Sequence, residues 1–135
     1  MEIHRITSEA SLPIRKAVLW PDHPIEASQV DGDETAQHFG GFKEDHLICV
    51  ASPFPSETEI RLRKFATLRD FQGNGVGSAM MSHLLTHARQ QGFARFWFDA
   101  RESAMPFYAR FGFETESTRF FKRDIPYRRM FLDLN

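Results

Sequence analysis

The segment FQGNGVGS, residues 71 to 78, places three glycines within five positions. An alternating segment, residues 59 to 68, precedes it, and a stretch with apolar residues every four positions, residues 75 to 91, follows it. The sequence therefore predicts a strand, a glycine-rich turn and a helix in direct succession. The first amides of a helix have no partner within it, and with the helix dipole they attract anions. The turn therefore predicts a site for phosphate groups.

Several kinds of turn compete for this segment. A P-loop requires a lysine and a serine or threonine after its last glycine, whereas Gly77 is followed by Ser78 and Ala79. A dinucleotide fingerprint requires a third glycine three positions after the second, and position 78 is serine. A plain glycine-rich turn that starts a helix is the structural alternative. The spacing that fits a known phosphate loop is Gln72-x-x-Gly75-x-Gly77.

The pattern along the rest of the chain predicts an α/β fold with a mixed sheet. Strands are expected at residues 2–7, 37–42, 46–53, 59–68, 93–100, 113–121 and 127–134, and helices at residues 12–20, 75–91 and 103–110. Ser8 or Ser11 is expected to cap the first helix. Glycine at position 92 is expected to end the second.

Two of these strands carry a prediction about which side chains are buried. Alternation in residues 59–68 divides the strand into two faces, Ile60, Leu62 and Lys64 against Arg61, Arg63 and Phe65. The apolar strand FARFWFDA, residues 93–100, is expected to be buried on both faces.

Composition narrows the class of protein. The 135 residues are expected to form one domain, residues 1–135, with its own core. A formal net charge of −1 gives no reason to expect nucleic acid or a membrane as a partner. The N-terminus MEIHRITSEA has no apolar h-region, so no secretory signal is expected. The single cysteine, Cys49, excludes an internal disulfide and suits a reducing cytoplasm.

The loop spacing, from Gln72 to Gly77, resembles that of the GNAT superfamily of acetyl-CoA-dependent N-acetyltransferases. Downstream, AMPFYARFGF, residues 104–113, is similar to the family's A-x-x-F-Y-x-x-x-G-F segment, and residues 62–67 stand where its cofactor-contacting strand is expected. The likeness covers residues 59–115 by motif and the remainder by element order. It implies a mixed, mostly antiparallel sheet with splayed central parallel strands, flanked by helices.

The resemblance also implies acetyl-CoA as co-substrate and no metal. The pyrophosphate of coenzyme A is expected on Gln72, Gly73, Asn74, Gly75, Val76, Gly77 and Ser78. Glycines leave room for the phosphates, and backbone N–H groups bind them. The splayed strands would be residues 59–68 and 93–100. Along the first, the backbone of Phe65, Ala66 and Thr67 is expected to face pantetheine and the acetyl carbonyl, where an N–H group would stabilise the oxyanion.

Tyr108 matches the family tyrosine that protonates the departing coenzyme A thiolate, so the resemblance implies Tyr108 as general acid. An aromatic residue packed on a helix, with its hydroxyl bonded elsewhere, is the structural alternative. The base that takes the amine's proton stays open, with Glu59, Asp99, His38 and His46 as candidates. Asp99 departs from the family, in which many members have an asparagine that donates a hydrogen bond, whereas a carboxylate only accepts.

The expected reaction is direct acetyl transfer to a primary amine in a ternary complex. Cys49 is an alternative acyl carrier, but it lies in an apolar run where a buried, inert thiol is expected. The acceptor, a small-molecule or protein amine, is open, and a homodimer is compatible with the sequence. The acidic residues 26–34 could attract a cationic amine or form a solvated loop. A non-catalytic acyl-CoA sensor is the rival function, and the loop spacing disfavours a nucleotide-binding protein.

Overall fold

The structure is a computed structural model that describes the backbone of residues 1–135 and every side chain other than that of Ser117. Its elements are β1 (Glu2–Arg5), α1 (Ser8–Leu19), η1 (Ile25–Ser28), β2 (Phe39–Lys43), β3 (His46–Ser56), β4 (Glu59–Thr67), η2 (Arg69–Phe71), α2 (Val76–Gln90), β5 (Arg95–Arg101), η3 (Glu102–Ala104), α3 (Met105–Ala109), β6 (Glu114–Lys122) and β7 (Ile125–Asp133). The order of strands and α-helices is the predicted one, with short 3-10 turns added. No helix in the described chain is long and apolar enough to cross a bilayer.

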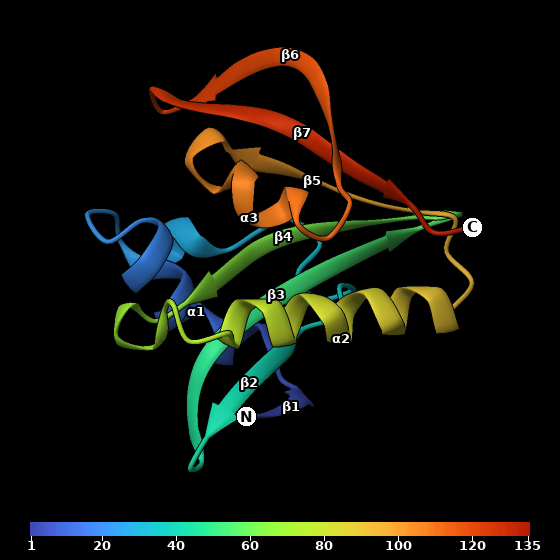
Figure 1. The fold of residues 1–135 in the computed structure, drawn as a ribbon. Helices are drawn as coiled ribbons and strands as arrows, with labels where there is room; N and C mark the ends of the chain where they lie inside the picture. Colours follow the sequence, from blue (N-terminus) through green and yellow to red (C-terminus); the bar gives the residue numbers. More distant parts are fainter.

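The strands form one sheet with the order β1-β2-β3-β4-β5-β7-β6. Its neighbouring pairs are antiparallel, except that β4 and β5 run parallel. Figure 1 shows β1 at one edge of the sheet, the β6–β7 hairpin at the other, and α2 lying across one face. The mixed, mostly antiparallel sheet flanked by helices is therefore confirmed.

The central strands β4 and β5 are joined at one end only. Their register pairs Glu59 with Arg95, Ile60 with Phe96 and Arg61 with Trp97, which are the first three residues of each strand. Beyond these pairs the strands diverge, as Figure 1 shows, and each presents an unpaired backbone edge to the gap. The splayed parallel strands are therefore confirmed.

Helices cover the two faces of the sheet with separate apolar clusters. On one face α2 buries Met80, Leu84 and Ala88, the stripe that the sequence predicts, against β3, β4 and β5. Full burial of the Met80 and Leu84 side chains contributes roughly 1.5–3 kcal/mol each. On the opposite face α1 packs Ile14 against Val50 of β3. We refer to these faces as the α2 side and the α1 side.

Strand β4 contains a β-bulge at Lys64 that the sequence does not predict. The register with β3 passes from the pair Ser52–Arg63 to the pair Val50–Ala66, so Lys64 and Phe65 lie opposite a single residue. Lys64 has φ of 54°, a left-handed conformation that is uncommon for a residue with a side chain.

The bulge decides where two side chains point. Phe65 faces the α2 side, where its ring centroid lies 6.4 Å from that of Tyr108. Lys64 faces the α1 side, where its ammonium lies 6.0 Å from the centroid of the Trp20 ring. The predicted alternation is therefore wrong at these two positions, because one extra residue shifts the period of two.

Three further expectations require correction. Thr7, rather than Ser8 or Ser11, caps α1, because its hydroxyl accepts a hydrogen bond from the amide of Ala10 at 3.2 Å. Strand β5 alternates between buried and half-buried residues instead of being buried on both faces, and its half-buried face carries Arg95, Trp97, Asp99 and Arg101. The helix expected at residues 103–110 is split into η3 and α3.

Candidate active site

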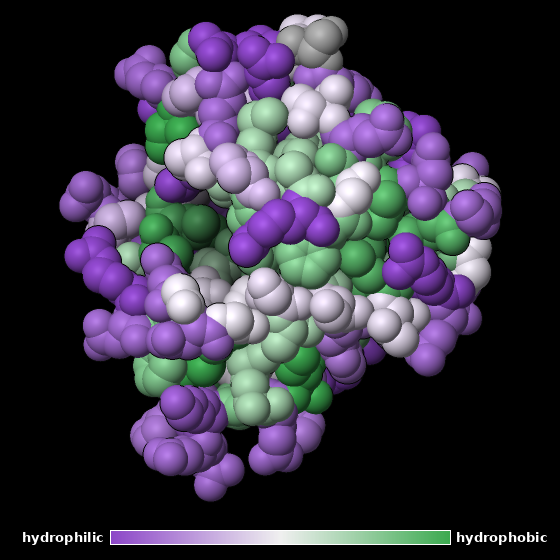
Figure 2. All heavy atoms as spheres, in the orientation of Figure 1, coloured by the Kyte–Doolittle hydropathy of each residue, from purple (hydrophilic) through white to green (hydrophobic). Residues whose placement is uncertain are grey.

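A cavity of about 200 Å³ lies between β4 and β5 where the two strands diverge. Elements outside these strands also line it and contribute Leu19, Trp20, Tyr108 and Tyr127. Successive strand residues point to opposite faces. Phe98 of β5 therefore faces the α2 side, whereas Asp99 and Arg101 face the α1 side. The cavity therefore reaches both faces of the sheet. Figure 2 shows a hollow with an apolar floor on this side of the molecule.

The turn predicted to hold phosphate lies between β4 and α2. Gly73 and Gly75 have φ of 80° and 82°, and a Cβ at either position would meet nothing within 4 Å. Gln72 Nε2 donates a hydrogen bond to the carbonyl of Thr67 at 2.8 Å, which ties the turn to the end of β4. The backbone bonding of the helix starts at the amide of Ala79, which donates to Gly75 at 3.0 Å. The amides before it have no partner within the helix, which fits a phosphate group.

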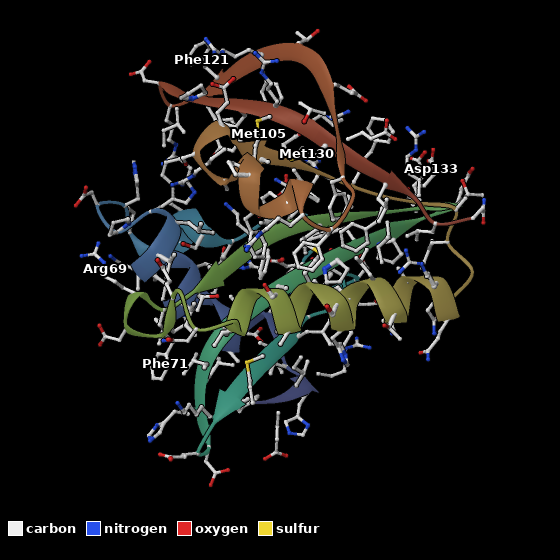
Figure 3. All side chains as sticks on the ribbon, in the orientation of Figure 1. Arg69, Phe71, Met105, Phe121, Met130 and Asp133 are labelled. Atoms are coloured by element: carbon white, nitrogen blue, oxygen red, sulfur yellow. The ribbon has the colours of Figure 1, made fainter. Side chains whose placement is uncertain are left out.

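Gly77 connects this turn to the helix that carries Tyr108. A Cβ at Gly77 would lie 3.5 Å from Cζ of Phe107 and 3.7 Å from Cζ of Phe65. Unlike the two glycines before it, Gly77 therefore faces the protein, and the first turn of α2 rests on aromatic rings that also contact Tyr108. Arg69 lies in η2, just before the glycine turn, and Figure 3 shows its side chain extending outward toward solvent.

Tyr108 is held by neighbouring rings and not by its hydroxyl. Its ring centroid lies 4.3 Å from that of Phe98 and 5.2 Å from that of Phe107. The hydroxyl has no hydrogen-bond partner in the described chain, and Tyr108 lines the cavity. Burial raises the pKa of Tyr108, and the charge of Arg101 only partly opposes this. The phenol therefore keeps its proton at neutral pH and is free to donate it as a hydrogen bond.

Asp99 lies in the cavity wall but is already paired. Its two carboxylate oxygens accept hydrogen bonds from Arg61 at 3.0 Å and from Arg129 at 2.9 Å, and Lys122 lies 3.7 Å away. The Asp99 side chain is 6% exposed. Both carboxylate oxygens of Asp99 are therefore already engaged by guanidinium groups.

The other three base candidates lie outside the cavity. Glu59 is at the first residue of β4, in the end that pairs with β5. His46 is exposed at the start of β3. His38 is buried, and its ring nitrogens lie 2.8 Å from Oγ of Ser52 and 2.7 Å from the carbonyl oxygen of Asp33. Only Asp99 among the four candidates is brought to the cavity.

Cationic residues on the cavity wall are the part of the site that sequence reasoning missed. We call this group the cationic wall; it consists of Arg61, Arg63, Lys64, Arg101 and Lys122. These residues come from β4, β5 and β6, which are far apart in sequence. The only sequence signal is the run RLRK at residues 61–64, which has the alternation of an ordinary strand with a solvated face.

Cys49 is fully buried in β3, as the sequence predicts. Burial raises the pKa of its thiol to about 11, although the hydroxyl of Thr67 donates a hydrogen bond to Sγ at 3.4 Å. A thiol with this pKa is protonated at neutral pH and is a poor nucleophile.

Comparison with known proteins agrees with this geometry. Residues 3–113 match the model of the acetyltransferase (GNAT) family. The chain is 29% identical over 135 residues to YitI, an uncharacterized N-acetyltransferase of Bacillus subtilis (strain 168), with 93% of this chain and 89% of that protein covered.

Two crystal structures share the fold. The ribosomal-protein-S18-alanine N-acetyltransferase from Escherichia coli matches with a TM-score of 0.83 at 20% identity, over 98% of this chain and 93% of that chain. A GNAT family acetyltransferase from Elizabethkingia anophelis with acetyl-CoA bound matches with a TM-score of 0.78 at 11% identity, over 98% of this chain and 97% of that chain. The family match over most of the chain makes this protein a member of the GNAT acetyltransferase family and an acetyl-CoA-dependent acyltransferase.

Proposed function

We propose that this chain, as a single domain, transfers the acetyl group of acetyl-CoA to a primary amine by direct transfer, with both substrates bound at once. The observation that carries the proposal is the cavity between β4 and β5, which has Tyr108 and the open edge of β4 around it. In this reaction the neutral amine nitrogen bonds to the acetyl carbon and loses one proton to a base, the bond from that carbon to sulfur breaks, and the thiolate takes a proton from the general acid. Direct transfer is supported by the burial of Cys49, which leaves no accessible thiol to carry the acetyl group.

The turn before α2 is the proposed site for the pyrophosphate of coenzyme A. The residues are Gln72, Gly73, Asn74, Gly75, Val76, Gly77 and Ser78. Their support is the open space around the two glycines of positive φ and the unpaired amides at the start of the helix. An anion held at such a helix end gains up to about 2 kcal/mol in partly buried geometries.

The outer part of β4 is the proposed site for pantetheine and the acetyl carbonyl. Ala66 and Thr67 pair with β3 on one side, whereas Phe65, Ala66 and Thr67 have no strand partner toward β5. An extended arm can bind to such an edge as an additional strand. An N–H group fixed in this edge would stabilise the oxyanion without rearranging, which is an efficient form of catalysis.

Tyr108 is the proposed general acid. A protonated phenol that lines the cavity and lacks a partner in the described chain is suited to donate as negative charge grows on sulfur. Of the two proposed bases, Asp99 has the support of position, because Glu59 lies at the paired end of β4. Because both carboxylate oxygens of Asp99 are already engaged by Arg61 and Arg129, we expect the rate to follow the fraction of acceptor that arrives as neutral amine.

A screen of amines with acetyl-CoA, monitored by release of free thiol, tests the proposal. Acceptor-dependent thiol release and a mass increase of the acceptor by one acetyl group are expected. The rival function, an acyl-CoA sensor, predicts binding of acetyl-CoA without transfer to any amine of the panel. The proposed location is the cytoplasm, supported by the single cysteine, which is free and buried.

A further inference from the structure

The cavity carries far more positive charge than the molecule as a whole. Five cationic side chains, the cationic wall, line it together with one carboxylate, Asp99. The whole chain has a formal net charge of −1. The cavity lining is therefore net positive although the rest of the chain is net negative, and such a focused field selects ligands by their charge.

Among the described residues, protein carboxylates neutralise only part of this wall. Asp99 is shared among Arg61, Arg129 and Lys122. Across the described residues no carboxylate lies within 4.0 Å of Lys64 or Arg101. Arg101 instead donates hydrogen bonds to neutral groups on other elements. The two cations therefore face the cavity with charge that the protein leaves uncompensated.

The local structure holds several cationic side chains close to one another. The bulge turns the side chain of Lys64 toward the α1 side, where Lys64, Arg101 and Arg123 approach the ring of Trp20 to 6.0, 5.2 and 4.6 Å from its centroid. Burial, followed by the repulsion of nearby cations, lowers the pKa of Lys64 to about 8. A bound anion would relieve this repulsion, and a perturbed pKa on the wall of a cavity marks a candidate functional site.

We propose that the amine acceptor also carries a carboxylate, and that Lys64 and Arg101 bind this carboxylate on the α1 side of the cavity. The inference rests on the proposed acetyl transfer, because it names the acceptor class for the same site. The acceptor's amine would then point toward Tyr108, which lines the same cavity from α3. Nη1 of Arg101 makes no hydrogen bond within the described chain and is left for a carboxylate, and Trp20 and Tyr127 line the same cavity.

The acidic segment, residues 26–34, does not oppose this assignment. None of its residues lines the described part of the cavity. Its Asp33 is bound to the buried guanidinium of Arg15 at 2.8 Å. Burial alone would raise the pKa of Asp33, but the hydrogen bonds from Arg15 and from the amide of Val30 lower it overall. The expectation that this segment attracts a cationic amine to the site therefore has no support in the geometry.

The test compares acceptors of matched length. The chain is supplied with acetyl-CoA and with 4-aminobutyrate, butylamine or 1,4-diaminobutane, which end in a carboxylate, a methyl group or an ammonium. L-Alanine and L-alaninamide form a second pair, and O-phosphoethanolamine replaces the carboxylate by phosphate. We expect kcat/KM for the carboxylates to exceed that for their uncharged counterparts by about ten- to hundredfold, the range for a hydrogen bond to a charged group.

Variants then locate the effect. Lys64→Met keeps the length of the side chain and should reduce the preference for 4-aminobutyrate over butylamine by about tenfold, without changing the affinity for coenzyme A. Lys64→Glu should reverse the order, so that 1,4-diaminobutane becomes the better acceptor. Arg89→Gln is the matched control, because it removes one positive charge from the exposed end of α2 and should leave the preference unchanged.

Binding of 4-acetamidobutyrate to the coenzyme A complex, measured by calorimetry, gives a readout that needs no turnover. Transfer with a preference for butylamine or the diamine would overturn the carboxylate assignment while leaving acetyl transfer intact. A preference for O-phosphoethanolamine over both carboxylates would replace the carboxylate by phosphate as the recognised group. Carboxylate binding that depends on Lys64, but without transfer to any amine, would support the anion site and overturn the proposed enzyme function. Absence of both binding and transfer would overturn the two together.

Discussion

Tyr108 and Tyr127 are the two tyrosines of the chain, and both line the cavity. Tyr108→Phe retains the ring that packs against Phe98 and deletes only the hydroxyl. If this hydroxyl assists departure of the thiolate, kcat should fall by about 10²–10⁴-fold, while acetyl-CoA affinity and the melting temperature change little. Steady-state kinetics with the best acceptor, in a regime limited by chemistry, would measure the effect.

Tyr127→Phe provides a control within the same cavity. The Tyr127 hydroxyl accepts a hydrogen bond from Nε of Arg101 at 3.2 Å, so its removal should change the KM for the acceptor more than kcat. An equal loss of kcat in the two variants, or no loss in Tyr108→Phe, would remove Tyr108 as the acid.

Lys64 gives the stability of the protein a defined pH dependence. Its native pKa is about 8, against an ordinary value of 10.5, because it is buried and because Arg63 of β4, Arg15 of α1 and the hairpin residues Lys122 and Arg123 repel its charge. Between these two values the unfolded chain holds a proton that the native chain has lost. The free energy of unfolding therefore rises with pH from about 8 to about 10.5 on account of this residue.

Urea unfolding of the wild type and of Lys64→Met at pH 7, 8, 9 and 10 tests this linkage. Taking the difference between the two proteins cancels other groups that titrate in this range, such as the Cys49 thiol. The free energy of unfolding of the wild type should increase relative to that of the variant as pH rises. A difference that stays constant with pH would mean that the pKa of Lys64 is not lowered in the native state.

At the scale of elements, a side chain added to the turn between β4 and α2 should weaken coenzyme A binding more than it weakens folding. Gly75→Glu would place a carboxylate in the proposed phosphate space, so the affinity for coenzyme A should fall at least tenfold. Gly92→Glu is a matched control, because Gly92 has φ of 83° and Gly75 has φ of 82°, and a Cβ at either meets nothing within 4 Å. Each change should cost about 1–2 kcal/mol of stability through the left-handed backbone.

Calorimetric titration with coenzyme A, alongside thermal unfolding, distinguishes the two variants. Similar loss of stability with weak binding only in Gly75→Glu is expected. Equal affinity in the two variants would place the pyrophosphate elsewhere.

The sequence predicts elements better than it predicts how they meet. The order of strands and helices and the buried face of α2 follow from local periodicity, which the sequence displays directly. The bulge at Lys64 does not, because it arises from the register between β3 and β4 and has no local signature in the run RLRKF. The cationic wall is hidden for the same reason, since strands distant in sequence build it. Tyr108 and the glycine turn were found because their residues stand at fixed spacings within short segments.

For the molecule as a whole, acetyl-CoA should act as a stabilising ligand and ATP should not. The turn before α2 lacks the lysine with which a P-loop binds nucleotide phosphates. A ligand at a hundredfold excess over its Kd stabilises the native state by about 2.7 kcal/mol, which corresponds to a rise in melting temperature on the order of 10 °C for a chain of this size. Thermal unfolding with coenzyme A, acetyl-CoA and ATP at equal concentration measures this. Equal shifts with ATP and coenzyme A would contradict the assignment of the turn.

The short junction between β4 and β5 is where we expect the sheet to bend most easily. Two blocks, β1–β4 and β5–β7, are joined in the sheet through the parallel pairing of only three residues from each strand, all at one end. Rocking of one block against the other bends few backbone hydrogen bonds, so the far ends of β4 and β5 should be the most compliant part of the sheet. A ligand bound between them would supply backbone hydrogen bonds that the two strands do not make with each other. Binding of a ligand in this gap should therefore make the whole sheet more rigid, including strands that the ligand does not contact.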